Sequence, residues 1–186
     1  MAQNENSLLN TKKVNFHTSK IPWNVENYNL SEDKKSIVFI TNEAGLNKMY
    51  LMNALDKSYL VVKNIPIGLI GGANFTKDKQ ALFFTQSTAQ SASDIYKLTL
   101  KTGVIQRWTE SELGEMQTSD MSVPKFIEWK SFDNLKISGF YYPAAAKFTG
   151  KRPVLIQIHG GPEGQSQASF LGASNFYTNE MGVAMI

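Results

Sequence analysis

The sequence predicts an all-β region built from repeated four-stranded units, followed by the first part of an α/β domain. Two observations predict this fold. A pattern of polar turn and β-rich run occurs twice in the first half of the 186-residue chain. Further on, an apolar strand breaks at a pair of glycines, and a helical stretch and a second apolar run follow it. A chain of this length holds one or two ordinary domains.

The repeat is clearest in two segments that align residue by residue. Residues 29–39 (NLSEDKKSIVF) align with residues 74–84 (NFTKDKQALFF), with the Asn, the Asp, a Lys and the final Phe identical. After one residue of drift, KMYL at 48–51 aligns with DIYK at 94–97. Each unit is a polar turn, a β-rich run, a loop and a strand that carries a tyrosine. A period in the forties is that of a four-stranded β-propeller blade.

Two further expectations concern the blades. Tyr50 and Tyr96 occupy equivalent places in the two units, and we expect them to pack in the propeller rather than bind a ligand. Residues 86–93 are rich in Ser, Thr, Gln and Ala, and this composition predicts a flexible loop within a blade.

Residues 126–143 (FIEWKSFDNLKISGFYYP) predict a hairpin. Alternation places Phe126 on one face and Trp129 on the other, and Asp-Asn at 133–134 is a turn sequence. The strand pattern resumes at 135 and 137, and the hydrophobic spacing up to Phe140 indicates a phase slip near Gly139.

The next strand leads into a glycine turn. Residues 154–158 (VLIQI) are apolar except for Gln157, as in a parallel strand buried on both faces. His159, Gly160, Gly161 and Pro162 follow. The glycines allow positive φ and a close approach of backbone to ligand, while the proline offers no NH. Backbone NH groups in a rigid turn can stabilise an oxyanion; the alternative is a strand-to-loop turn without chemistry.

HGGPEGQ at 159–165, with the apolar strand before it, resembles the first glycine-rich loop of the prolyl oligopeptidase family of serine peptidases, in particular its acylaminoacyl-peptidase and dipeptidyl-peptidase-like branch. The resemblance implies a β-propeller joined to an α/β-hydrolase domain. It implies an oxyanion donor at the Gly161 NH, aided by Gly160, in a loop positioned by His159 and Pro162. The members that use a loop tyrosine are a poorer match, because no tyrosine lies between Arg152 and Gln165.

The resemblance extends upstream and divides the chain. NEAG at 42–45 followed by MYL at 49–51 resembles the family's blade motif, and the hairpin at 126–143 resembles the one that opens the hydrolase domain. We therefore expect C-terminal propeller blades over 1–122 and the N-terminal portion of an α/β-hydrolase domain over 123–186.

The last residues predict a loop entering a helix over 166–181, ended by Gly182 and followed by a buried strand at 183–186. The aromatic and apolar residues of the helix are expected to cover a sheet: Phe170, Phe176, Tyr177 and Met181. Because a domain rarely ends inside a buried strand, we expect the chain to be a fragment.

Serine hydrolysis of this kind needs a nucleophile, a base and an acid that orients the base. Ser166 is a poor nucleophile candidate because no strand leads directly into it. We expect His17 to be exposed or packed in the propeller, and His159 to hold the turn through hydrogen bonds as a neutral imidazole. The resemblance implies that the catalytic Ser, Asp and His all lie beyond this region, so the chain itself is expected to be inactive.

Composition and charge limit the kinds of partner that we expect for this chain. The net charge is +3 with a pI near 9.0, but the basic residues are scattered in pairs, which predicts solvated turns and no nucleic-acid partner. No apolar run approaches the roughly 20 residues that span a bilayer, so we expect no membrane partner. The absence of cysteine excludes disulfides and Cys-ligated metals, and we expect neither metal nor cofactor. Residues 1–6 do not resemble a signal peptide, which favours the cytoplasm if Met1 is the native start.

The implied function is that of a serine peptidase that hydrolyses short peptides through an acyl-enzyme, with a propeller that limits substrate size. Glu26, Glu32 and Glu43 are expected to be surface turn residues rather than anchors for a substrate amine. Two alternatives stay open: a propeller binding module with a non-catalytic hydrolase partner, and an esterase, which the repeat disfavours. The peptide end that is cleaved, the number of blades and the oligomeric state are not indicated.

Overall fold

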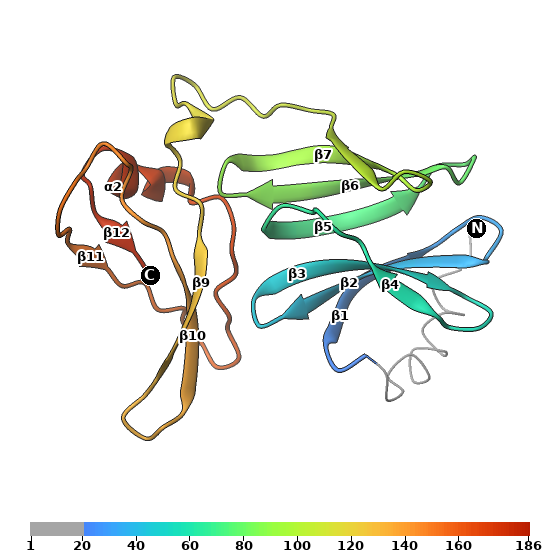
Figure 1. The fold of residues 1–186 in the computed structure, drawn as a ribbon, viewed down its shortest axis with the longest axis horizontal. Coiled ribbons are helices and arrows are strands. Elements are labelled where there is room, and N and C mark those ends of the chain that lie inside the picture. The colour runs from blue at the N-terminus through green and yellow to red at the C-terminus, as the bar shows by residue number, and fades with distance from the viewer. Residues whose placement is uncertain (1–20) are drawn as a thin grey trace.

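The computed structural model describes residues 21–186, so His17 and residues 1–6 lie outside the described residues. Two four-stranded antiparallel sheets come first, in the orders β1-β2-β3-β4 and β5-β6-β7-β8 (Figure 1). The strands of the first sheet are Asn24–Leu30, Ser36–Glu43, Leu46–Asn53 and Tyr59–Val61. Those of the second are Gly68–Phe75, Ala81–Thr88, Ser91–Thr99 and Val104–Arg107. Each sheet is a meander of sequential neighbours, as in a propeller blade.

The two sheets confirm the repeat. Phe39 stacks on Tyr50 in the first sheet with ring centroids 5.0 Å apart, and Phe84 stacks on Tyr96 in the second at 5.6 Å. The repeated asparagines also meet, because Asn29 Nδ2 donates to Asn74 Oδ1 at 2.5 Å. Residues that align in sequence thus occupy equivalent places in neighbouring blades.

The main core lies between these blades. Val38, Ile40 and Met49 of the first blade pack with Leu82 and Leu98 of the second, and all are nearly inaccessible to solvent. Burial of each such side chain contributes about 1.5 to 3 kcal/mol. Both tyrosines pack as predicted. Tyr96 belongs to this core, and Tyr50 is half-buried between Phe39 and Tyr59 within its own blade.

The prediction of a flexible loop over 86–93 is wrong. Strand β6 continues to Thr88 and β7 begins at Ser91, so the segment is a tight hairpin. Its polar side chains find partners inside the blade, since Gln86 Nε2 donates to the Pro66 carbonyl at 2.5 Å and Ser91 donates to Asp94.

The predicted hairpin is confirmed as β9 (Lys125–Lys130) and β10 (Lys136–Tyr141). The turn residue Asn134 has a φ of +67°, and Asp133 Oδ1 accepts from the Leu135 NH at 3.1 Å. The expected phase slip is absent, because the pairing runs from Lys136 opposite Lys130 to Tyr141 opposite Lys125 without a register shift. By strict alternation Ile137 and the buried Phe140 lie on opposite faces.

The last strands are β11 (Val154–Leu155) and β12 (Ala184–Met185), which pair in parallel as predicted for the glycine-turn strand. Tyr142 forms an antiparallel bridge with Met185, so the strand order continues as β9, β10, β12, β11. The chain passes between β11 and β12 through the turn η2 (Gly172–Ser174) and helix α2 (Asn175–Asn179). This segment is a short βαβ unit.

The predicted loop leads into a helix, which has only five residues. The expected burial of this unit is wrong. Ile158 is 84% exposed and Phe176 59% exposed, since no element of residues 21–186 packs over them. Val154, Tyr177 and Met181 are likewise exposed.

Candidate functional site

The glycine turn leaves the sheet directly after β11. Gln157 NH donates to the Ile186 carbonyl at 2.7 Å, and the chain departs from its neighbour at His159. Gly161 has a φ of +74°, in the left-handed region that glycine adopts without steric cost. The second glycine of the pair therefore takes the positive φ that the turn needs.

The turn folds back on itself. A Cβ built on Gly164 would lie 2.6 Å from the Gly160 carbonyl oxygen and 2.7 Å from His159 Nδ1, so only glycine fits there. Among residues 21–186 the His159 side chain makes no hydrogen bond, which contradicts the expected hydrogen-bonded role. The His159 ring lies against Gly164 instead.

The two candidate donors are accessible. His159, Gly160, Gly161 and Pro162 are all exposed, and nothing lies within 4 Å of a Cβ built on Gly160 or Gly161. Within the described part of the chain, neither glycine NH has a hydrogen-bond acceptor. Two adjacent free NH groups can donate to an incoming oxygen without first breaking a hydrogen bond.

A groove of about 990 Å³ lies beside the turn. Its walls are largely apolar, with Trp129 and Phe140 from the hairpin, and His159 and Ser166 also line it. In the described residues Ser166 makes no hydrogen bond to a histidine or a carboxylate. Among these residues, Ser166 therefore has no base beside it of the kind that a triad provides.

Glu43 is not a surface turn residue, which corrects the prediction. It is 7% exposed and accepts from Tyr50 Oη at 2.6 Å, Thr41 Oγ1 at 3.1 Å and Lys48 Nζ at 2.5 Å. Burial raises the pKa of Glu43, but the hydrogen bonds from Lys48, Tyr50 and Thr41 outweigh burial and lower it. Burial, together with the Glu43 carboxylate, raises the pKa of Tyr50. Both carboxylate oxygens of Glu43 therefore already accept hydrogen bonds from residues of the same blade.

The other two glutamates differ from Glu43. Glu32 is exposed, as predicted. Glu26 is exposed but lies in β1 rather than in a turn, and its carboxylate accepts from Asn42 Nδ2 and Asn47 Nδ2, both at 2.9 Å.

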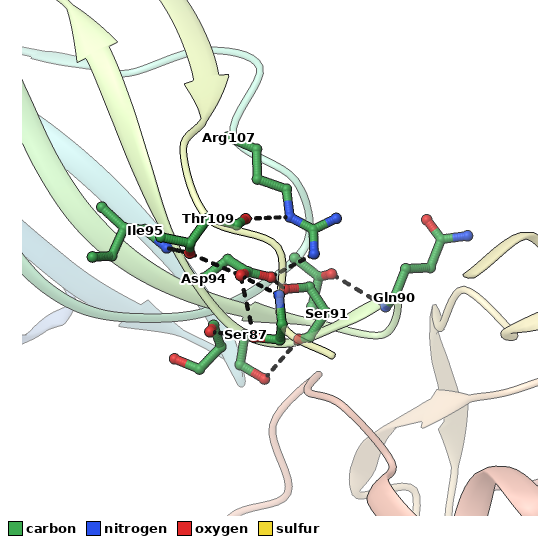
Figure 2. A network of polar contacts seen from close by, with 10 residues as sticks. Ser87, Gln90, Ser91, Asp94, Ile95, Arg107 and Thr109 are labelled. Atoms are coloured by element: carbon green, nitrogen blue, oxygen red, sulfur yellow. Dashed lines mark hydrogen bonds and ion pairs between the residues drawn. The ribbon is translucent and has the colours of Figure 1, made fainter. Parts of the chain in front are cut away.

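A buried polar network around Asp94 was missed by the sequence analysis (Figure 2). Asp94 is 1% exposed and accepts from Ser91, from Arg107 at 2.6 Å, from Thr109 Oγ1 at 2.9 Å and from the Ser111 NH at 2.8 Å. Burial raises the pKa of Asp94, but these donors outweigh it and lower the pKa from 3.8 to about 2. The Asp94 carboxylate therefore links strand β7 to Arg107 at the end of β8 and to the residues that follow it. The signal for it was an acidic residue in a predicted strand, where the other repeat has Lys48.

Residues 21–186 lack two other kinds of feature. No group of three or more potential metal ligands comes together in this range. Nor does any helix in it have the length and apolarity needed to cross a membrane.

Comparison with known proteins gives a fold but no close relative. No family model matches the sequence, and no curated protein matches it. A prolyl endopeptidase structure matches with a TM-score of 0.69 and 13% identity, over 90% of this chain and 24% of that one. A puromycin-hydrolyzing peptidase from Mycobacterium tuberculosis matches with a TM-score of 0.64 and 14% identity, over 85% of this chain and 24% of its own.

The acylaminoacyl peptidase of Pyrococcus horikoshii matches with a TM-score of 0.64 and 20% identity, over 89% of this chain and 24% of that one. The chain thus spans about 24% of the length of these structures. At such identities the likeness concerns the fold, and the chain is similar in fold to a segment of peptidases of the prolyl oligopeptidase type.

Proposed function

We propose that this chain is part of a serine peptidase of the prolyl oligopeptidase type, with propeller blades over 1–122 and the start of an α/β-hydrolase domain over 123–186. Three features support the proposal. Two four-stranded blades precede a parallel βαβ unit, a glycine turn follows the first strand of that unit, and the solved structures of similar fold are peptidases.

In this proposal the NH of Gly161, aided by that of Gly160, donates to the oxyanion of the tetrahedral intermediate. One observation carries the assignment: both NH groups are accessible and unbonded in the described chain, just beyond the carboxyl end of a parallel strand. Ligands of open α/β sheets bind at this edge. A preorganised donor of this kind contributes about 3 to 4 kcal/mol to transition-state stabilisation.

The nucleophilic serine, the base and the orienting acid belong to the longer protein in this proposal, as the family resemblance implies. The serine attacks the scissile carbonyl, its proton passes to the base, and the carbonyl oxygen becomes the oxyanion held by the turn. The substrate class is short peptides, because a propeller beside the site limits the size of what enters.

Labelling with a fluorophosphonate probe tests the proposal. We expect the 186-residue chain to stay unlabelled, and the longer protein to be labelled on a serine and to cleave aminoacyl, dipeptidyl or acylaminoacyl chromogenic substrates. A longer protein that binds peptides but takes no label would refute hydrolysis and favour a binding module. Turnover of simple esters without any peptide cleavage would favour an esterase.

A further inference from the structure

We propose that Asn42, near the end of strand β2 in the first blade, is a positioning residue for the glycine turn and acts through Gln165. This inference rests on the proposed role of Gly161 as an oxyanion donor. It makes the first blade a part of the machinery that places that donor.

The Asn42 side chain bonds to its own turn and to the distant loop at once. Its Oδ1 accepts from the Gly45 NH at 2.8 Å, which shapes the blade turn. Its Nδ2 donates to Gln165 Oε1 at 2.7 Å and to Glu26 Oε1 at 2.9 Å. Gln165 is the last residue of the HGGPEGQ segment, so the hydrogen bond joins the blade to the end of the glycine loop.

The residues after Gln165 are seated on the same blade turn. A Cβ built on Gly45 would lie 2.9 Å from the Ser166 carbonyl oxygen, so the two backbones are in close contact. Gln167 Nε2 lies 3.4 Å from Glu26 Oε1. Ala168 is 1% exposed, in a small apolar cluster with Phe140 against which Leu46 of the blade packs. Residues 165–168 therefore form a docked segment rather than a free loop.

The glycine turn depends on this docked segment for its position. No atom lies within 4 Å of a Cβ built on Gly160 or Gly161, so the turn lacks packing partners at its tip. One end is fixed by β11. The other is Gly164, which packs against the Gly160 carbonyl and the His159 ring and is bonded covalently to Gln165. Releasing Gln165 from Asn42 therefore frees one of the two ends that hold the donors in place.

The 186-residue chain tests this directly through Asn42→Asp. The substitution keeps the oxygen that accepts from the Gly45 NH and removes the group that donates to Gln165 and to Glu26. Gln165→Ala removes the contact with Gln165 and leaves the one with Glu26 in place. We expect the amide resonances of Gly160 and Gly161 to shift in ¹H–¹⁵N spectra. Hydrogen exchange at Phe170, whose NH lies 3.4 Å from Ser87 Oγ, is expected to rise by up to about tenfold, the effect of losing one hydrogen bond.

A second substitution separates positioning from general destabilisation. Adding Gln165→Lys to Asn42→Asp restores a donor and an acceptor across the same gap, and we expect the glycine resonances to return toward their original positions. Asp56→Asn, in an exposed turn of the same blade, is the matched control and should leave them unchanged. If Asn42→Asp unfolds the blade, Gln165→Ala removes the same contact from the loop side and should give the same glycine shifts.

Unchanged Gly160 and Gly161 resonances in Asn42→Asp and Gln165→Ala would overturn the inference, as would shifts that the added lysine does not reverse. These spectra require no hydrolysis. A failed fluorophosphonate labelling of the longer protein would therefore remove the proposed function without altering them, whereas unchanged spectra beside successful labelling would remove only the role of Asn42.

Discussion

Replacing Asp94 by Asn tests whether the buried carboxylate holds the second blade together. Asn has nearly the shape of Asp but carries no charge, and its NH₂ group would face the donors that now point at Asp94 (Figure 2). The main loss is the interaction of a charged acceptor with Arg107, Thr109 and Ser111.

The lowered pKa sets the size of the effect. A fall from 3.8 to about 2, at 1.36 kcal/mol per pKa unit, corresponds to about 2.5 kcal/mol of stability from the ionised group. Because the folded-state pKa lies below the unfolded value, this stability is fully present above about pH 4 and is lost as the pH falls toward 2. The variant should therefore be less stable than the parent chain at neutral pH, and the difference should shrink in acid.

Urea unfolding at a series of pH values measures this difference in stability between the variant and the parent chain. Tryptophan fluorescence is a suitable signal, because Trp108 directly follows β8 and packs against Phe83 with ring centroids 4.8 Å apart. Glu32→Gln, at an exposed carboxylate of the first blade, serves as the control and should change stability little. An Asp94→Asn chain as stable as the parent at neutral pH, or a difference that does not vary with pH, would show that the carboxylate does not stabilise the second blade.

Three other substitutions test further parts of the fold. Phe84→Ala empties a core site that is 2% exposed and should lower the free energy of unfolding, measured in urea, by about 3 to 5 kcal/mol. A loss below about 1 kcal/mol, which is typical of surface substitutions, would contradict that packing. Gly45→Ala should destabilise the chain more than Gly103→Ala in thermal melts. Both have positive φ, but only Gly45 has a carbonyl oxygen 2.9 Å from the added Cβ, so equal melting temperatures would contradict the close contact. Glu43→Gln should lower the pKa of Tyr50 in a spectrophotometric titration, because it removes the carboxylate charge that helps raise it; an unchanged titration would count against that contact.

The blades could be predicted because the repeated residues form their structure through hydrogen bonds with neighbours in the sequence. The turn aspartates, Asp33 and Asp78, accept from the NH groups two positions on, in Lys35 and Gln80. Such bonds are local, so the sequence pattern predicts them. The stacked Phe-Tyr pairs then follow from strand alternation.

The predictions that failed concern residues whose burial or conformation depends on contacts between distant segments. Glu43 and Asp94 are buried because donors meet them from other strands and from the following chain, and a hydropathy pattern treats both as surface residues. The segment 86–93 was expected to be flexible for its polarity, but cross-strand partners order it. The docking of residues 165–168 on the first blade was not predicted either, because the Asn42–Gln165 hydrogen bond joins residues that are 123 positions apart.

Only those features of the candidate site that depend on neighbouring residues in the sequence could be predicted. The strand, the two glycines and the positive φ of Gly161 follow from the sequence. The packing of Gly164 on His159, and the hold of the first blade on Gln165, required three-dimensional structure.

The most direct test of the central claim is the kinetics of Gly161→Ala in the longer protein, acting on a chromogenic peptide. Alanine disfavours the φ of +74° and displaces the NH that would hold the oxyanion. We expect a fall in kcat that approaches the roughly 10²- to 10³-fold loss of an oxyanion donor, with KM little changed. Gly103→Ala, at a φ of +70° in the second blade, should leave kcat unaltered. An unaltered kcat in folded Gly161→Ala enzyme would contradict the claim that this turn is half of an oxyanion hole.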